Sequence, residues 1–230
     1  MGRFIATIEN RISLKMTLST DALIMRTINS LIAAKYAAGE NVVNLLTAYN
    51  DAVGETDALT AEEALRNTEF LRFATKTIAL YKDYLKTAGS LYNSGNYVTF
   101  TPAENLKFVV LSEFAKDMET YLYSDTFHNE FVKMDGFATV PFWQGTGTAG
   151  ADFESRSKII AKPAGSEDTQ TINGVVAVMF DEQAAAVCNE NYRVTSQYNA
   201  RGEYTNYFYK WDASYMNDTE ENCIVFTIAD

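Results

Sequence analysis

The chain has 230 residues, of which 47% are hydrophobic and 21% are charged, and these proportions exclude disorder as its main state. Its formal net charge is −11, unevenly placed: residues 1–115 carry 11 basic and 12 acidic side chains, whereas residues 116–230 carry 8 and 18. This balance argues against a protein that grips nucleic acid or an anionic membrane by bulk charge, because such binding needs Lys and Arg concentrated on one face.

The cysteines and the N-terminal residues indicate a compartment. Cys188 and Cys223 are too few for a disulfide scaffold in a chain of this length, and the N-terminus reaches charged residues before a signal-like apolar stretch develops. No apolar run approaches the roughly 18 residues that cross a bilayer. We therefore expect a reduced, cytosolic setting, in which the glycosylation sequon at residues 217–219 occurs by chance.

The first 38 residues lack proline and, after Gly2, lack glycine, which predicts a helix of about 35 residues. At 100° per residue its apolar side chains change face along the chain, which excludes a single coiled-coil seam. The early face holds Phe4, Ile5, Ile8, Ile12 and Met16, and the later one holds Ile24, Met25, Ile28, Leu31 and Ile32. The alternative is two helices parted near residues 19–21, which are of types that favour caps and turns.

The middle of the chain continues with helical patterns. Gly39 ends the first region, and residues 60–63 have the form of a capping box. Helical spacing then predicts one long or two short helices over residues 61–91, followed by a turn at residues 93–96. Residues 97–101 look extended, and Pro102 stops them.

The second half is predicted to be rich in strands. A buried strand at residues 108–111 precedes a helix at 112–122, and a second strand at 175–180 precedes a helix at 181–187. Two further extended segments, at 192–199 and 203–216, and a closing strand at 224–228 complete the pattern. Two strand–helix units place helices against a mixed sheet, so the predicted fold class is α+β.

Two features invite a catalytic or cofactor-binding interpretation. Residues 145–150 match the G-x-G-x-x-G pattern, but neither a buried strand before them nor an apolar helix after them is present, so we interpret them as a loop. His128 is the only histidine, and no nucleophile signature or paired metal-ligand spacing accompanies it, which favours a surface or helix-packing role. We predict no catalytic, cofactor-binding or metal-ligating residues.

The remaining charged and aromatic clusters favour a structural role. The carboxylate pairs Glu62–Glu63 and Glu220–Glu221 are expected on solvated faces or turns. The densest aromatic segment covers residues 204–211 and continues to Tyr215, with too little positive charge for base stacking. Packing between strands or between subunits explains it better, which points to assembly rather than catalysis.

Residues 193–212 and the closing strand at 224–226 resemble the end of tailed-bacteriophage major capsid proteins, especially a group from phages of gut bacteria. Four other segments agree with that family in the same order, at residues 21–29, 43–46, 123–127 and 140–145. The resemblance spans nearly the whole chain. Its specificity comes from the number and order of these segments, since none of them is a catalytic motif.

This resemblance implies the Hong Kong 97-type capsid fold, with a long spine helix, a peripheral domain and an axial domain of helices around a mixed sheet. The implied division is a spine helix at residues 1–38, a mainly axial domain at 39–190, and strands returning to the peripheral or axial sheet at 191–230. The implied function is a structural subunit, without enzymatic activity, of an icosahedral shell. Its partners would be copies of itself in hexamers and pentamers, and possible portal, scaffold and decoration proteins. The shell would enclose DNA without binding it specifically, and the subunit would contact no membrane. It would be made in the bacterial host cytoplasm and located in the virion.

Family members carry an N-terminal arm and an extended two-stranded loop before the spine helix, and this sequence starts at or inside that helix. We therefore expect a truncated chain that folds but is impaired in assembly. Two alternatives stay open at this point: an encapsulin-like nanocompartment shell protein, and a hydrolase that uses an unrecognised carboxylate pair.

Overall fold

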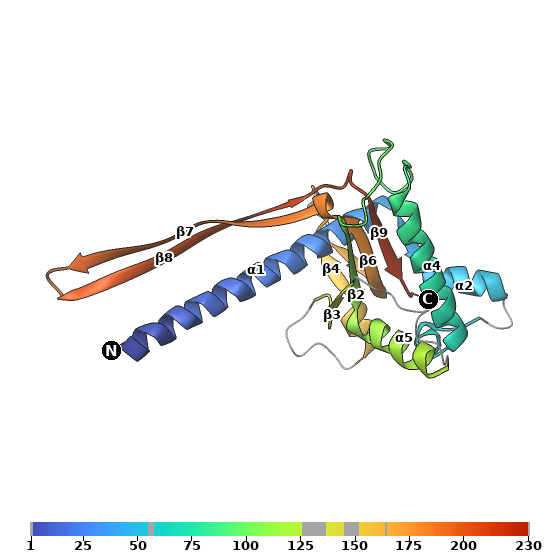
Figure 1. Ribbon diagram of the computed structural model, residues 1–230, viewed down its shortest axis with the longest axis horizontal. Coiled ribbons are helices and arrows are strands. Elements are labelled where there is room, and N and C mark those ends of the chain that lie inside the picture. The colour runs from blue at the N-terminus through green and yellow to red at the C-terminus, as the bar shows by residue number, and fades with distance from the viewer. Residues whose placement is uncertain (1, 55–57, 126–136, 145–151, 164, 230) are drawn as a thin grey trace.

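A computed structural model describes residues 2–54, 58–125, 137–144, 152–163 and 165–229. Figure 1 shows a body of sheets and helices, from which one long helix and one long hairpin extend to the same side. The predicted α+β class is confirmed.

The long helix α1 (Gly2–Ala38) is unbroken over 37 residues, roughly 55 Å at 1.5 Å per residue. This excludes the alternative of two helices parted near residues 19–21. The hydroxyl groups of Thr17 and Thr20 donate to main-chain carbonyls of Ser13 and Met16 one turn earlier, at 3.1 and 3.0 Å, so these residues close the helix ladder instead of capping a new helix. Gly39, at φ +67°, ends α1 in the left-handed conformation that glycine adopts at little cost.

A five-stranded mixed sheet forms the centre of the body. Its strand order is β1 (Val42–Asn44), β9 (Cys223–Thr227), β6 (Val175–Asp181), β2 (Leu106–Leu111) and β3 (Ala138–Val140). The outer pairs β1–β9 and β2–β3 are parallel, and β6 is antiparallel to both of its neighbours. Every residue of β6 and β9 is buried, which explains why these strands appear in the sequence as continuous apolar runs.

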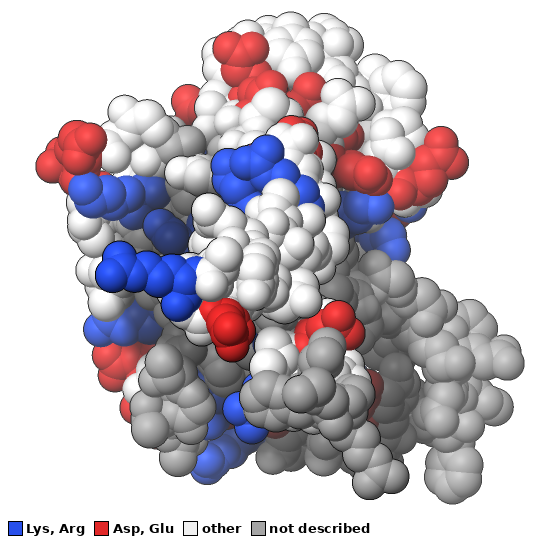
Figure 2. Space-filling view, turned by 90° about the vertical axis from the view of Figure 1, so that its left-hand side faces the viewer, with Lys and Arg blue, Asp and Glu red and all other residues white. Residues whose placement is uncertain are grey.

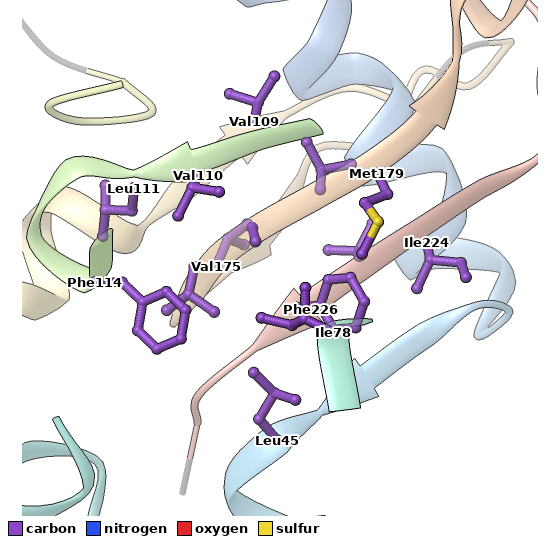
Figure 3. Close-up of a cluster of buried hydrophobic side chains, with 14 of the residues drawn as sticks. Leu45, Ile78, Val109, Val110, Leu111, Phe114, Val175, Met179, Ile224 and Phe226 are labelled. Carbon is purple, nitrogen blue, oxygen red and sulfur yellow. The ribbon is translucent and has the colours of Figure 1, made fainter. Parts of the chain in front are cut away.

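Helices cover both faces of this sheet. On one face the ring of Phe226 meets the ring of Tyr81 from α4 (Thr68–Lys86), with centroids 5.7 Å apart. Cys223 has the opposite parity along β9 and lies near Lys35 of α1 on the other face. Figure 3 shows side chains from β2, β6 and β9 meeting Leu45 of α2 (Leu45–Val53), Ile78 of α4 and Phe114 of α5 (Ser112–Asp125).

A smaller antiparallel sheet of β4 (Ile159–Ala161) and β5 (Gln170–Ile172) packs on α1. Trp143 connects the segment at residues 137–144 to β6 and α1 by two hydrogen bonds. Its indole Nε1 donates to the carbonyl oxygen of Val175 at 2.7 Å, and its own carbonyl oxygen accepts from Asn29 at 2.9 Å. The short helix α6 (Phe153–Ser157) lies just before β4.

Several predicted elements are confirmed, with their bounds sharpened. The strand at 108–111 and its helix are β2 and α5. Residues 61–91 form two helices, α3 (Ala61–Ala64) and α4, because the side chain of Asn67 accepts from the Phe70 amide and starts a new helix. The extended segment at 97–101 makes only an isolated bridge between Gly89 and Thr99.

The predicted helix at residues 181–187 is wrong. Only a 3₁₀ turn, Glu182–Ala184, follows β6, and strand β7 (Ala185–Asn199) begins at once. The carboxylate of Asp181 accepts from the Gln183 amide at 3.0 Å and closes the turn. Ala185 to Val187 then pair with the end of β8 (Tyr204–Asn217), so strand pairing overrides the helix propensity of the alanines.

Candidate assembly surface

The most unusual feature of the molecule is the pair of long elements, α1 and the β7–β8 hairpin, that project from the body. The first two-thirds of α1 and the hairpin of β7 and β8 extend together and diverge toward their ends (Figure 1). We call residues 2–24 and 185–217 the arm. In the described part of the chain, β7 and β8 pair only with each other, so both outer edges of a hairpin of about 15 residues per strand are free.

The strand register divides the side chains of the hairpin between two faces. Val187, Asn189 and Tyr215 lie on the face toward α1, where Asn189 donates to the Thr20 hydroxyl at 2.8 Å. Thr195, Tyr204 and Phe208 lie on the opposite face. A bulge at Asn191, with φ +54°, adds one residue to β7, so that beyond it the even-numbered residues of β7, such as Val194, face α1.

The arm is about a quarter of the chain but carries more than half of the exposed large hydrophobic side chains among the described residues. They are Ile8, Leu14, Leu18, Ile24, Tyr192, Val194, Tyr198, Tyr204, Tyr207, Phe208, Tyr215 and Met216. Tyr207 and Tyr215 are each 64% exposed. Exposed apolar groups in this number mark an interaction surface, and a two-stranded hairpin with free edges is rarely stable alone in water.

The charges on the arm are mixed in sign. The hairpin holds Arg193, Arg201 and Lys210 together with Glu190, Glu203 and Asp212, and Lys210 pairs with Asp212 at 3.7 Å. Figure 2, viewed from the side on which the arm extends, shows basic and acidic side chains interspersed among larger uncharged areas. The described part of this face therefore shows no continuous basic surface of the kind that binds nucleic acid (Figure 2).

A model of the Phi29-like phage major capsid protein family matches residues 1–227. The chain belongs to this family. The capsid-family chain also resembles solved structures: a chain in the capsid of Staphylococcus phage Andhra has a TM-score of 0.59 at 12% identity, covering 98% of this chain and 63% of that one. A chain in the structure of the head fiber and inner core protein gp22 of native bacteriophage P68 has a TM-score of 0.53 at 11% identity, covering 96% and 64%.

At such low identities these likenesses show the fold of the capsid-family chain alone. The chain spans about 63% and 64% of the lengths of the two structures that it matches. No curated protein sequence matches it. The resemblance to phage major capsid proteins that the sequence indicates is confirmed, while its Hong Kong 97-type subclass stays a prediction.

The structure places the two carboxylate pairs singled out in the sequence at exposed or half-buried positions. Glu63 accepts from the Thr60 amide at 3.0 Å, and this hydrogen bond lowers the pKa of its carboxyl as expected for a capping box. Glu62 and Glu220 are exposed, and Glu221 is half-buried. His128 and residues 145–150 lie outside the described residues.

The two cysteines differ in their exposure to solvent. Cys188 is exposed on β7, while Cys223 is buried and its pKa is raised to about 12 by burial. Among the described residues, no group of three or more His, Cys, Asp or Glu side chains could hold a metal ion. None of the described helices is long and apolar enough to cross a membrane.

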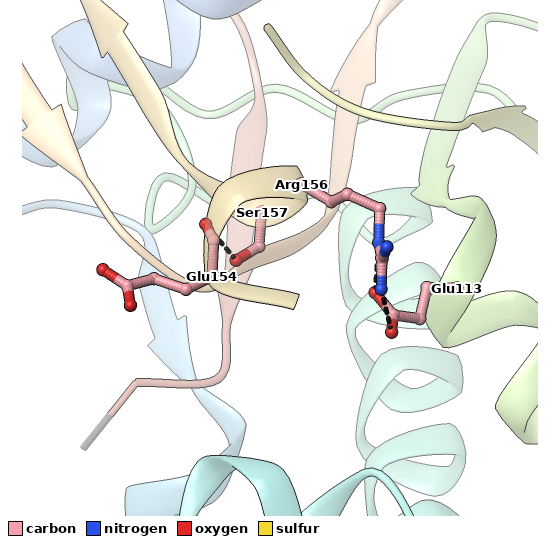
Figure 4. Close-up of polar contacts among 4 residues, drawn as sticks. All are labelled: Glu113, Glu154, Arg156 and Ser157. Atoms are coloured by element: carbon pink, nitrogen blue, oxygen red, sulfur yellow. Dashed lines mark hydrogen bonds and ion pairs between the residues drawn. The ribbon is translucent and has the colours of Figure 1, made fainter. Parts of the chain in front are cut away.

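One polar cluster in the body of the capsid-family chain has a perturbed acid. Arg156 of α6 donates from Nε to Glu113 of α5 at 2.8 Å, and a second bond from Nη2 makes the contact bidentate (Figure 4). Asp117 lies one turn beyond Glu113 on α5. Burial, and secondly the negative charge of Glu113, raise the pKa of Asp117 to about 6, although Arg66 and Arg156 oppose the shift.

Asp117 gives a testable pH dependence. Its folded pKa lies above the ordinary 3.8, so the folded state holds the proton more tightly, and stability falls as pH rises from about 4 to 6. We expect Asp117→Asn to raise the melting temperature at pH 7.5, with the gain shrinking toward pH 4. Thermal melts followed by circular dichroism measure this, with Asp51→Asn on an exposed turn of α2 as the control. Equal melting temperatures at pH 7.5 would contradict the burial of an ionised Asp117.

Proposed function

We propose that the chain is a structural subunit of a bacteriophage capsid, which assembles with copies of itself into the shell that encloses the genome. The observation that carries this proposal is the family match over residues 1–227. The exposed apolar arm supports it, because a monomer gains nothing from such a surface, whereas a shell subunit needs one for its neighbours. The assembled subunit would accordingly be located in the virion.

The finer details belong to the same proposal. We propose a Hong Kong 97-type arrangement in which α1 is the spine helix, residues 39–190 are mainly axial, and residues 191–230 supply strands that return to the peripheral or axial sheet. Hexamers and pentamers would be the repeating units, with portal, scaffold or decoration proteins as further partners. Synthesis would take place in the host cytoplasm, and we propose no catalytic role for the subunit.

The acidic composition supports a shell that does not hold its genome tightly. The second half of the chain carries 18 acidic and 8 basic side chains, and packed phosphates are repelled by a surface of this balance. We therefore propose that DNA is enclosed without specific binding.

Self-association tests the proposed function. Sedimentation velocity over a wide range of concentrations is expected to show larger species growing at the expense of the monomer, because exposed apolar side chains are covered in a complex. Negative-stain microscopy of the same samples shows whether these species are curved sheets, capsomers or closed shells. A chain that stays monomeric at every concentration would overturn the proposal.

A further inference from the structure

A second exposed surface lies at the C-terminal end of α1, on the body. Residues 91–100 and 218–222 come together there, and we call them the corner. Lys35 of α1, only 1% exposed, holds the two loops: its Nζ donates to the Ser94 hydroxyl at 2.9 Å and to the Thr219 carbonyl oxygen at 2.7 Å. The two loops are thereby fixed on one buried cation.

Further hydrogen bonds fix the conformation of the corner. The Cys223 amide donates to the Tyr92 carbonyl oxygen at 3.1 Å, which ties the first loop to β9. Within that loop, the Asn93 side chain donates to the Tyr97 carbonyl oxygen at 2.9 Å. A surface held in this way loses little conformational entropy when a partner binds it.

The corner carries both exposed apolar side chains and carboxylates. Leu91 and Val98 are 76% and 73% exposed, and Phe100 is also exposed. In the same loop the Tyr97 hydroxyl donates to Glu221 at 3.4 Å. Burial, followed by the charges of Asp181 and Asp218, raises the pKa of Glu221. The second loop adds the exposed Glu220. The two loops of the corner therefore present exposed apolar side chains together with a cluster of carboxylates.

A groove of opposite character lies between α1, β4 and β8. It encloses about 530 Å³, and its lining includes the exposed apolar side chains Ile160 and Tyr215. Arg26 and Lys162 lie at the same groove. Lys162 pairs with Glu167 at 3.1 Å in an exposed contact, whereas Arg26 has no ion-pair partner among the residues that the structure describes. Exposed pairs of this kind rearrange at little cost.

We propose that the corner of one subunit docks into this groove on a second copy of the chain. The exposed apolar side chains of the corner would meet Ile160 and Tyr215 of the groove. The carboxylates of the corner would face Arg26 and Lys162. The two surfaces adjoin on each molecule, since Asn217 lines the groove and Asp218 begins the second loop of the corner. Each copy therefore carries both halves of the contact, as repeated association requires. The inference rests on the proposed function and names a contact at the base of the arm, because Tyr215 and Asn217 of β8 line the groove.

A charge swap tests this pairing by sedimentation. Glu220→Lys and Arg26→Glu change exposed side chains, so each variant should fold, which circular dichroism checks. Each alone is expected to weaken self-association about tenfold, and the combined variant should restore it because opposite charges again face each other. Glu62→Lys on α3, an equal charge change away from both surfaces, should leave the association unchanged.

The outcomes separate this inference from the proposed function. If the wild-type chain associates and both single variants associate equally well, the corner contact is overturned while the capsid function stands. If the single variants weaken association and the combined variant does not restore it, the pairing of corner with groove is overturned. A wild-type chain that never associates overturns both.

Discussion

Replacing Trp143 by alanine is expected to lower the free energy of unfolding by about 3–5 kcal/mol, as for other large aromatic side chains removed from a core. Trp143 is 1% exposed, and its indole donates to the Val175 carbonyl oxygen at 2.7 Å, so the change leaves both a cavity and an unpaired carbonyl in the central sheet. Urea unfolding followed by circular dichroism measures the loss.

Two matched variants separate the causes. Trp143→Phe keeps most of the ring but removes the hydrogen bond, and it should cost about 1–3 kcal/mol. Trp211→Ala removes the same side chain from a half-exposed position on β8 and should cost less than either. If Trp143→Ala were as stable as Trp211→Ala, the packing of the segment 137–144 on β6 would be wrong.

Placing aspartates on the outer face of the hairpin is expected to weaken self-association by about 100-fold or more. The combined variant Tyr204→Asp and Phe208→Asp puts two charges where exposed aromatic rings would be covered by a neighbour, and buried aromatics of this kind dominate binding energy. Because both rings are about half exposed in the single chain, its melting temperature should change little. Sedimentation velocity measures the association.

The control for the arm uses the same chemistry on the body. Leu80→Asp and Val53→Asp change exposed apolar side chains of α4 and α2, 42% and 37% exposed, away from the arm. Self-association of this control should stay close to that of the wild-type chain. Equal weakening by both pairs of substitutions would show a loss of general hydrophobicity and not a contact of the arm.

The sequence predicts those parts of the fold in which local pattern and tertiary structure agree. The strands β6 and β9 are apolar at every position except their last, Asp181 and Thr227, because both faces of the sheet are covered, and such runs are readily recognised. The single helix α1 is recognised from the absence of breakers. Residues 181–187 are mispredicted because their alanines favour a helix, while pairing with residues 215–217, about 30 positions away, decides their conformation.

One pattern in the sequence predicts the assembly surface. Along residues 204–209, aromatic side chains occur at both parities, so Tyr204 and Phe208 lie on one face of the strand and Tyr207 and Tyr209 on the other. A strand with one solvated face would alternate apolar and polar residues. The absence of this alternation indicates that both faces of the strand are buried when other parts of the chain or other subunits pack on them.

The corner leaves no such signal in the sequence. Lys35 is one charged residue among others on a long helix, and its burial depends on two loops about 60 and 185 positions away. The exposed Val98 and Leu91 look like ordinary apolar residues beside a turn. Only in the folded chain does the loop that carries them contact Glu221, through the Tyr97 hydroxyl.

The most direct test of the arm as the contact between subunits is hydrogen exchange of its backbone amides, measured on the monomer and on the associated protein. The free edges of β7 and β8 should exchange quickly in the monomer and become protected on association, while the amides of β6 and β9 stay protected in both. Equal exchange of residues 185–217 in the two samples would contradict the role of the arm as the contact between subunits.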